Sequence, residues 1–557
     1  MLLLAAGCRI FQFVFNYGAR VLNWRKAIPV EGAGSIQKIP ALLKQLRVTK
    51  PLVVTDPGLM SAGVAQKVLS VLGSAGVNYT LCDEVGPNPT VNMVNAIQDL
   101  YLTQGCDGFI AIGGGSPIDA AKGAAARVKF PKKTVNQLGG LLRVWKKIPP
   151  FIAVPTTAGT GSETTIAALI TDSETHHKYA IMDLHLIPLY AILDPELTVG
   201  LPRHITAMTG MDALTHAVEA YLCWTYGTKE SIQFALDAVK YIFENLEKVY
   251  HDGSDIAARQ AMLVASYKAG FAFTRAGVGN VHAIAHTLGG LYNTAHGLAN
   301  AVILPVVLRD YGKAAHKKLA RLSDIAGLAP ETASAEAKAD AFIDAVFAMN
   351  KRMGIPAGFD FIKETDIPQM IAWASKEANP LYPVPVVYDA PRYRRIIESL
   401  ALPAHDGEDE TVGKRNGRRA YRITSACIGC TACAKVCPVF AITGERGAVH
   451  AVNPKRCVSC GVCGSICPSG AVSDPSGIQR VRQQRSERRK PRIDTGLCSA
   501  CGICVTDCTA GALSISEPAF KGDIAACAEL SAPQKCIACS LCEKHCPLGA
   551  IRMEIPA

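Results

Sequence analysis

Three histidines crowd into one short stretch of the chain. His282, His286 and His296 lie within fifteen residues, although the whole sequence contains only thirteen histidines. On a helix, His282 and His286 would stand one turn apart and share a face. Gly289 and Gly290 can end that helix and bring His296 back towards it. A lone histidine is more often a core or surface residue, but this clustering indicates a metal site.

A second pair of candidate ligands lies upstream. Asp212 and His216 have the same one-turn spacing, so they could offer a carboxylate oxygen and an imidazole nitrogen to one ion. Nitrogen and oxygen donors of this kind bind iron or zinc. The sequence therefore predicts one metal centre built from two separate segments.

These two segments resemble the metal signatures of a known family. GMDALTHAVEAY (210–221) and VHAIAHTLGGLYNTAHG (281–297) closely resemble those of the iron-containing, or group III, alcohol dehydrogenases. The resemblance implies that His286 lies beside the nicotinamide and the substrate, where it is the candidate catalytic residue for relaying the hydroxyl proton. It also implies Fe²⁺, with zinc as the alternative, on four ligands: Asp212, His216, His282 and His296.

A glycine-rich turn predicts the dinucleotide site. Residues 108–125 (GFIAIGGGSPIDAAKGAA) pass from an apolar strand through glycines into a helix, so backbone N–H groups can face a pyrophosphate. A glycine triplet alone would also suit a tight turn. The resembled family, however, holds NAD(P) with a GGGSxxD pattern. The implied cofactor residues are Gly113, Gly114, Gly115, Ser116 and Asp119.

Further cofactor residues follow from the same resemblance. Asp56 ends an early strand, and a carboxylate beside the adenosine ribose favours NAD over NADP because it repels a 2′-phosphate. The alternative is that Asp56 only opens the turn before Pro57. Lys178 could add a positive charge near the site, although lysines are usually solvated. The segment 151–163 supplies hydroxyl donors from Thr156, Thr157, Thr160 and Ser162.

Cysteine spacing gives the strongest pattern in the chain. CxxCxxCxxxC occurs four times, and thiolates at this spacing bind [4Fe–4S] clusters. In two-cluster ferredoxins the fourth cysteine of each motif binds the other cluster, whereas zinc would favour paired CxxC motifs. We therefore expect two modules with four [4Fe–4S] clusters. The sixteen ligands are Cys427, Cys430, Cys433, Cys437, Cys457, Cys460, Cys463, Cys467, Cys498, Cys501, Cys504, Cys508, Cys536, Cys539, Cys542 and Cys546.

Prolines that follow the fourth cysteine match bacterial ferredoxins in three motifs. They are Pro438, Pro468 and Pro547, and Thr509 takes their place in the third motif. Cys527 lies outside the pattern and is expected to be a core thiol. Because the cysteines fall in cluster motifs rather than in a disulfide framework, the sequence predicts a reducing, cytoplasmic location.

Periodicity separates the remaining chain into domains. Alternating strand-like and helical runs predict an α/β fold with a parallel sheet, and helical stripes follow it. The resemblance implies a dehydroquinate synthase-like pairing of these two parts, followed by two α+β ferredoxin-like domains. The expected domains are a leader (1–26), an α/β NAD-binding domain (27–203), a helical metal-binding catalytic domain (204–400), a linker (401–425), ferredoxin module 1 (426–475), a basic linker (476–493) and ferredoxin module 2 (494–557).

The flanking segments exclude some classes of partner. The apolar leader is interrupted by Arg9 far short of the ~20 residues that a membrane span needs, so we expect an amphipathic helix on the core and no membrane partner. Residues 480–492 carry seven basic residues without interleaved aromatics, which favours a solvated linker or a strip that docks an acidic redox partner over nucleic acid. The resemblance implies a homo-oligomer.

The combined sites predict an oxidoreductase. A metal ion would polarise the oxygen of a small alcohol or aldehyde while hydride moves to or from NAD. Hydride carries two electrons and each cluster exchanges one, so a flavin is normally needed between them. The sequence has no flavin fingerprint, because its one glycine-rich nucleotide site is already assigned to NAD. We therefore expect a separate flavoprotein partner. The alternative is an electron-transfer iron–sulfur protein whose dehydrogenase core serves mainly for docking.

Overall fold

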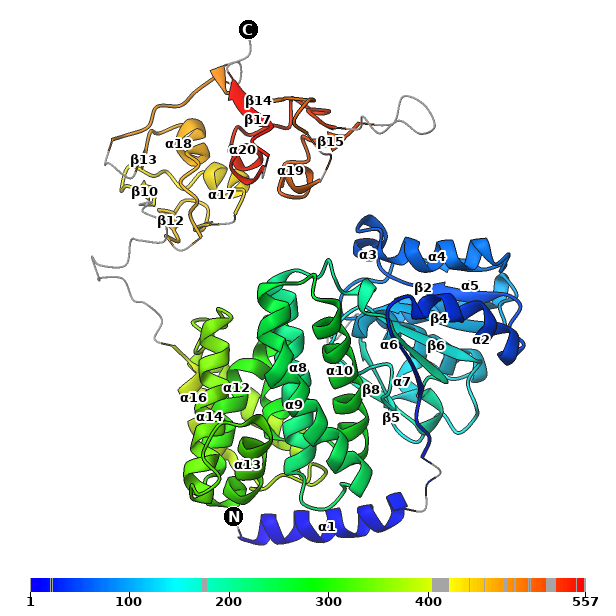
Figure 1. The fold of residues 1–557 in the computed structure, drawn as a ribbon. Helices are drawn as coiled ribbons and strands as arrows, with labels where there is room; N and C mark the ends of the chain where they lie inside the picture. Colours follow the sequence, from blue (N-terminus) through cyan, green and yellow to red (C-terminus); the bar gives the residue numbers. More distant parts are fainter. Residues whose placement is uncertain are drawn as a thin grey trace. The chain divides into compact units, whose positions relative to one another are not determined.

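The chain forms two compact units, Met1–Ala404 and His405–Ala557, and each is described by itself. In the computed structural model (Figure 1) the described residues are 2–20, 22, 24–172, 178–402, 420–439, 441–454, 456–474, 478–484, 487–498, 500, 502–516, 527–546 and 548–554.

A parallel sheet forms the centre of the first part of unit one. Each strand pairs in parallel with its neighbours, which confirms the predicted α/β fold. In sheet order the strands are β1 (Ile28–Glu31), β9 (Tyr190–Leu193), β6 (Phe151–Pro155), β4 (Gly108–Gly113), β2 (Pro51–Val54) and β3 (Thr80–Cys82). A smaller sheet joins β5 (Gly140–Leu141), β8 (Lys178–Met182) and β7 (Ala167–Thr171).

Helices cover both faces of the parallel sheet. Alternate residues of a strand point to opposite faces, and the two cores follow this rule: Phe109 of β4 joins one core, while Ile110 joins the other. Because both faces are covered, the strands are apolar throughout instead of alternating. The helices of this part are α2 (Ile39–Leu46), α3 (Pro57–Ser61), α4 (Val64–Ser74), α5 (Val91–Thr103), α6 (Gly115–Lys129) and α7 (Val135–Leu138).

The second part of unit one is helical, as predicted. Its core is the largest apolar cluster of the described chain, and it draws residues from every long helix of this part. Figure 1 shows these helices packed beside one another in green. They are α8 (Arg203–Leu222), α9 (Lys229–His251), α10 (Ile256–Ala276), α11 (Asn280–Tyr292), α12 (His296–Tyr311), α13 (Lys313–Ala326), α14 (Ala335–Arg352), α15 (Ile367–Ala378) and α16 (Ala390–Leu400).

The leader forms helix α1 (Leu2–Arg20), which packs on the helical part. Cys8 lies in a small core with Val384, and Arg9 donates hydrogen bonds to the carbonyls of Val384 and Pro385. Gln12 is fully buried and donates to the Pro380 carbonyl at 2.8 Å. Among the described helices, none combines the length and apolar character that crossing a bilayer requires.

Unit two contains two small modules with the same layout. Each has two antiparallel strand pairs and two one-turn helices. Module 1 has β10 (Arg422–Ile423) paired with β13 (Val472–Ser473), β11 (Ile442–Thr443) paired with β12 (Ala451–Val452), α17 (Ala432–Val436) and α18 (Val462–Ile466). Module 2 has β14 (Lys490–Ile493) paired with β17 (Ile551–Glu554), β15 (Ser514–Ile515) paired with β16 (Ala528–Glu529), α19 (Ile503–Thr506) and α20 (Leu541–His545).

Two of these strands lie inside segments expected to be linkers. β10 falls within 401–425 and β14 within 476–493. The basic segment is also partly ordered, because the Arg480 N–H donates to the Val472 carbonyl at 2.8 Å and the Gln483 N–H to the Ser465 carbonyl at 2.8 Å. β10 and β14 are too short to show a hydrophobic period in the sequence. They are recognised as strands only by their pairing with β13 and β17.

Candidate metal centre, dinucleotide loop and cluster motifs

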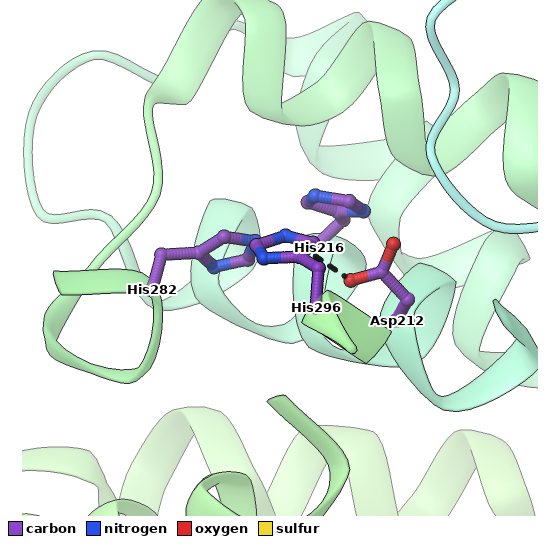
Figure 2. Close-up of side chains that lie close together, drawn as sticks. All are labelled: Asp212, His216, His282 and His296. Carbon is purple, nitrogen blue, oxygen red and sulfur yellow. Dashed lines mark ion pairs between the residues drawn. The ribbon is translucent and has the colours of Figure 1, made fainter. Parts of the chain in front are cut away.

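Three helices bring the four predicted metal ligands together. Asp212 and His216 lie one turn apart on α8, His282 lies on α11, and His296 begins α12. One donor atom from each residue lies within 4.8 Å of the others. Figure 2 shows the Asp212 carboxylate directed at the imidazole rings, with His296 Nε2 at 3.5 Å from Asp212 Oδ1. Asp212, His216 and His282 are buried, whereas His296 is partly exposed.

The turn that returns His296 to the site differs from the prediction. Gly289 and Gly290 lie inside α11, which continues to Tyr292 and ends where Asn293 adopts a left-handed conformation (φ 51°). Asparagine tolerates this conformation well enough to end a helix. The glycine at 290 serves packing instead, since an added Cβ would lie 3.3 Å from the Trp373 ring of α15.

Gly297 sets how closely α12 approaches α8. A Cβ at this position would lie 2.4 Å from the Met208 carbonyl oxygen and 3.3 Å from the Asp212 Cβ. Because such contacts are too short for any side chain, only glycine allows the start of α12, and with it His296, to reach the ligands on α8.

The donor set suits a divalent transition-metal ion. Burial lowers the pKa of His216, and it lowers the pKa of His282 well below the usual range, so both rings are neutral and keep a lone pair for a ligand bond. A carboxylate oxygen and three imidazole nitrogens in one cluster are donors that such an ion accepts.

Asn300 is a buried neighbour of the candidate ligands that the motif analysis missed. It lies one turn after His296 on α12 and is fully buried. Its Nδ2 is 2.7 Å from Asp212 Oδ1, 3.1 Å from His296 Nε2 and 3.2 Å from His282 Nε2. The amide therefore contacts three of the four donor atoms and holds them together. Its spacing of four residues from His296 was the available signal.

His286 lies next to the ligands without joining them. Its ring stacks on His296 with the centroids 5.2 Å apart, and its Nδ1 lies 2.6 Å from Glu377 Oε1 of α15. Tyr382 Oη donates to the same carboxylate at 2.7 Å. Burial alone would raise the pKa of Glu377, but His286 and Tyr382 outweigh it and the pKa is lowered. His286 thus has an anionic partner and a partly exposed ring.

The glycine triplet forms a close passage between β4 and α6. Gly113 has a φ of 150°, and an added Cβ there would meet the Pro117 ring at 2.6 Å. At Gly115, which begins α6, a Cβ would lie 3.1 Å from Thr160. The triplet therefore approaches the hydroxyl-rich loop after β6 and adds no side chain of its own at the N-terminus of α6. This arrangement suits a pyrophosphate.

Two predicted cofactor residues are bonded to each other. The Ser162 hydroxyl donates to the Asp119 carboxylate, and the Leu169 N–H donates to the other oxygen of Asp119 at 3.0 Å. Lys122, one turn further along α6 and not anticipated from the sequence, is fully buried and donates to the Thr165 and Ala167 carbonyls at 2.8 and 3.0 Å. Asp119 and Lys122 together clamp the loop that carries the predicted hydroxyl donors.

Asp56 opens the turn before Pro57, which is the alternative to the predicted contact with the ribose. It is the N-cap of α3, since the Leu59 N–H donates to Asp56 Oδ1 at 2.9 Å. It still stands at the carboxyl edge of the sheet, directly after β2. Thr156 bonds the neighbouring strand by donating its N–H to the Gly113 carbonyl at 3.0 Å. Lys178 begins β8, and its side chain lies outside the described residues.

The four cysteine motifs share one backbone geometry. A residue with positive φ precedes each one-turn helix: Thr431 (62°), Gly461 (78°), Gly502 (75°) and Ser540 (58°). In every motif the N–H four residues after the last cysteine donates to its sulfur: Ala441 to Cys437 (3.1 Å), Ala471 to Cys467 (3.3 Å), Ala512 to Cys508 (3.2 Å) and Ala550 to Cys546 (3.3 Å). Hydrogen bonds to the sulfur tune and stabilise a thiolate ligand.

A cavity in module 2 joins cysteines of two motifs. Its lining includes Cys508, the last cysteine of the third motif, together with Cys536, Cys539 and Cys542 of the fourth. This is the arrangement in which a fourth cysteine binds the other cluster. Cys501 lies outside the described residues, as does Pro547.

Comparison with known proteins identifies the family. The fold and the Asp/His site are those of a metal-dependent dehydrogenase. Sequence profiles described as "Iron-containing alcohol dehydrogenase" and "Fe-containing alcohol dehydrogenase family, C-terminal" match residues 29–195 and 206–388, and a "4Fe-4S dicluster domain" matches 426–471. The chain belongs to the iron-containing alcohol dehydrogenase family, as predicted, and it carries a 4Fe–4S dicluster domain near its C-terminus.

Named relatives cover the first unit. The NAD-dependent methanol dehydrogenase of Bacillus methanolicus is 39% identical over 340 residues, which are 61% of this chain and 89% of that protein. The lactaldehyde reductase of Escherichia coli (strain K12) is 36% identical over 345 residues, or 61% of this chain and 89% of that protein. The crystal structure of a 1,3-propanediol oxidoreductase superimposes with a TM-score of 0.66 at 34% identity, covering 68% of this chain and all of that one.

Proposed function

We propose that the chain is an NAD-dependent alcohol dehydrogenase or aldehyde reductase that acts on a small alcohol or aldehyde and exchanges electrons with a partner through its ferredoxin modules. The observation that carries this proposal is the convergence of Asp212, His216, His282 and His296 within 4.8 Å. The relatives named for methanol, lactaldehyde and 1,3-propanediol support a small substrate.

The chain's own residues account for the reaction's main requirements. A bound Fe²⁺, or Zn²⁺ in its place, would act as a Lewis acid on the substrate oxygen. Asp212, His216, His282 and His296 hold the ion, and Asn300 orients the Asp212 carboxylate at 2.7 Å. His286, held by Glu377 at 2.6 Å, relays the hydroxyl proton between the substrate and solvent.

The glycine turn and the clamped loop support NAD(H) binding. Gly113, Gly114, Gly115 and Ser116 form the turn proposed to take the pyrophosphate. Thr157 and Thr160 lie beside Gly114 and Gly115, and the Thr156 N–H donates to the Gly113 carbonyl. Asp119 and Ser162 act by fixing the loop, because their side chains bond each other. Asp56 keeps a carboxylate at the edge of the sheet and favours NAD over NADP by charge repulsion. Lys178 remains part of this proposed site.

The repeated motif geometry supports four [4Fe–4S] clusters in the proposal. The dicluster profile covers module 1, and module 2 has the same positive-φ residues and N–H to sulfur bonds at the same motif positions. Elemental analysis of the reconstituted chain is expected to give about 17 iron atoms, four per cluster and one in the dehydrogenase site. About 16 irons with one zinc would retain the mechanism and change the metal, whereas about nine irons would refute clusters in module 2.

A separate electron converter is part of the proposal. Hydride carries two electrons and each cluster exchanges one, so a flavoprotein is needed between NADH and the modules. The basic residues around 480–492 suit an acidic redox partner. Flavin in the purified chain, or cluster reduction by alcohol and NAD without another protein, would refute the need for this partner. The oxygen-sensitive clusters further favour a reducing cytoplasm, and the family's usual association favours a homo-oligomer.

An electron-transfer iron–sulfur protein whose dehydrogenase core serves mainly for docking is the second candidate. The second unit, His405–Ala557, lies outside the two dehydrogenase profiles, and its cysteine motifs favour this candidate. Deleting residues 426–557 separates the two, because the relatives correspond to the first unit alone and that unit has its own core. Alcohol-dependent NAD reduction by the truncated chain would support the enzyme, and its absence from both the truncated and the full chain would support the docking role.

A further inference from the structure

We infer that Glu219 is a positioning residue that fixes His282 in the tautomer whose Nε2 lone pair faces the metal. The inference rests on the proposed function, because it concerns how that metal is held. Glu219 lies on α8, one turn after His216 and two turns after Asp212, so the three share a face of the helix.

The Glu219 carboxylate is held from three directions. His282 Nδ1 lies 2.5 Å from Oε2, the Gly279 N–H donates to Oε2 at 2.9 Å, and the Val281 N–H donates to Oε1 at 2.8 Å. The group is buried, and α11 has no side-chain cap of its own at Gly279. Glu219 therefore caps α11 from a neighbouring helix and bonds the first histidine of that helix at the same time.

Gly279 makes this approach possible. A Cβ on Gly279 would lie 2.7 Å from Glu219 Oε1, so any larger residue would push the carboxylate away. The same carboxylate caps α11 and contacts the His282 ring. The first turn of α11 and the orientation of the His282 imidazole are therefore fixed together.

The two ring nitrogens of His282 face different groups. Nδ1 faces the carboxylate, while Nε2 lies 3.2 Å from Asn300 Nδ2 on the side of the other ligands. Oε2 accepts the Gly279 N–H and Oε1 accepts the Val281 N–H, so both oxygens of Glu219 act as acceptors where Nδ1 approaches. Nδ1 then carries the hydrogen, and Nε2 keeps its lone pair.

A second carboxylate in the site provides a matched control. Glu377 bonds Nδ1 of His286 at 2.6 Å, and His286 follows His282 by one turn on α11. The two contacts have the same chemistry, but His286 is not one of the four converging donors. Glu219→Gln changes the partner of a proposed metal ligand, His282, and Glu377→Gln makes the same change in the partner of its neighbour, His286.

The test measures Co²⁺ binding, which cluster iron does not obscure. In Glu219→Gln one amide N–H must face an N–H donor, so we expect Co²⁺ to bind about 10- to 100-fold more weakly than in the unchanged full-length chain. Glu377→Gln is expected to bind Co²⁺ within about twofold of the unchanged chain. Equal Co²⁺ affinity of Glu219→Gln and the unchanged chain would overturn the inference.

A double-mutant cycle separates positioning from helix capping. If Glu219 acts through His282, the effect of Glu219→Gln on Co²⁺ affinity should vanish in a His282→Ala background. An effect of the same size in both backgrounds would assign Glu219 a purely structural role. Glu219→Asp, which keeps a carboxylate for the α11 amides but reaches less far towards Nδ1, replaces the glutamine variant if that variant does not fold. Failure of the unchanged chain to bind Co²⁺ or to reduce NAD would instead refute the proposed function.

Discussion

In the first unit the proposed metal ligands come from three long helices that already share a large apolar core, whereas in the second unit the proposed cluster ligands are part of the cores themselves. Cys433, Cys463 and Cys467 are three of the seven buried residues in the core of module 1, and Cys504 and Cys542 are two of six in module 2. Small domains with so little apolar volume need metals or disulfides to fold.

The difference also appears in what holds the ligands. Asp212, His282 and His296 contact the buried Asn300 amide, and His282 also contacts Glu219, so side chains from the helical core hold these three proposed ligands. The last cysteine of each cluster motif instead receives a backbone N–H from its own motif. The fold of unit one thus builds its site, and we expect the clusters to build the fold of unit two.

Removal of the clusters is the test of this contrast with the largest expected effect. Metal binding supplies much of the folding free energy of small metal domains, so chelation of cluster iron is expected to unfold both modules. Limited proteolysis should then digest residues from about 420 onward and leave a fragment of about 400 residues that retains helical circular dichroism. Protease-resistant modules in the cluster-free chain would contradict the contrast.

Loss of one ligand should abolish the reaction without unfolding unit one. Asp212→Ala removes an anionic ligand, and we expect kcat to fall about 10³-fold, which corresponds to ~4 kcal/mol of lost transition-state stabilisation. The far-UV circular dichroism at 25 °C should stay unchanged, because the helical core does not depend on the ion. A collapse of the helical signal would show that the metal also builds this fold.

Asn300 tests whether the site is organised before the ion arrives. Asn300→Ala removes the donor shared by three ligands, so Co²⁺ affinity should fall about 10-fold, and the metal-free unit should lose roughly 1–3 kcal/mol of stability. Asn350→Ala is the matched control. Asn350 is also a buried asparagine, but its Nδ2 donates to the Ala301 carbonyl at 2.6 Å instead of contacting the proposed ligands. It should lose comparable stability and bind Co²⁺ normally.

The smallest expected effect is on pH dependence. Burial lowers the folded-state pKa of His216 and His282 below the ordinary 6.5. Between that folded value and 6.5 the unfolded chain binds protons that the folded chain does not, so stability rises with pH and is lost on acidification below 6.5. Thermal melts of the metal-free first unit should lose on the order of 1 kcal/mol per pH unit below about 6. His282→Gln should flatten this slope, and an unchanged slope would contradict the assignment.

Sequence alone predicted the features that are local in the chain. The parallel sheet was predicted from apolar runs such as Gly108–Gly113, and the 4Fe–4S domain was predicted from cysteine motifs of eleven residues. It could not predict contacts between separate helices. Glu219, Asn300 and Lys122 match no separate motif, and their partners lie 63, 88 and 43 residues away in the chain. The wrong helix end at Gly289 has the same cause, because packing of Trp373 against Gly290 outweighs the local glycine signal.

Gly297 fixes the width of the proposed metal site although it is not one of the four proposed ligands. It stands beside His296 and sets the separation of α12 from α8, with an added Cβ only 2.4 Å from the Met208 carbonyl oxygen. A single methyl group at this position would therefore enlarge the distance between ligands while leaving all four ligand residues unchanged. The spacing of the four proposed ligands is thus set by a residue that is not itself a ligand.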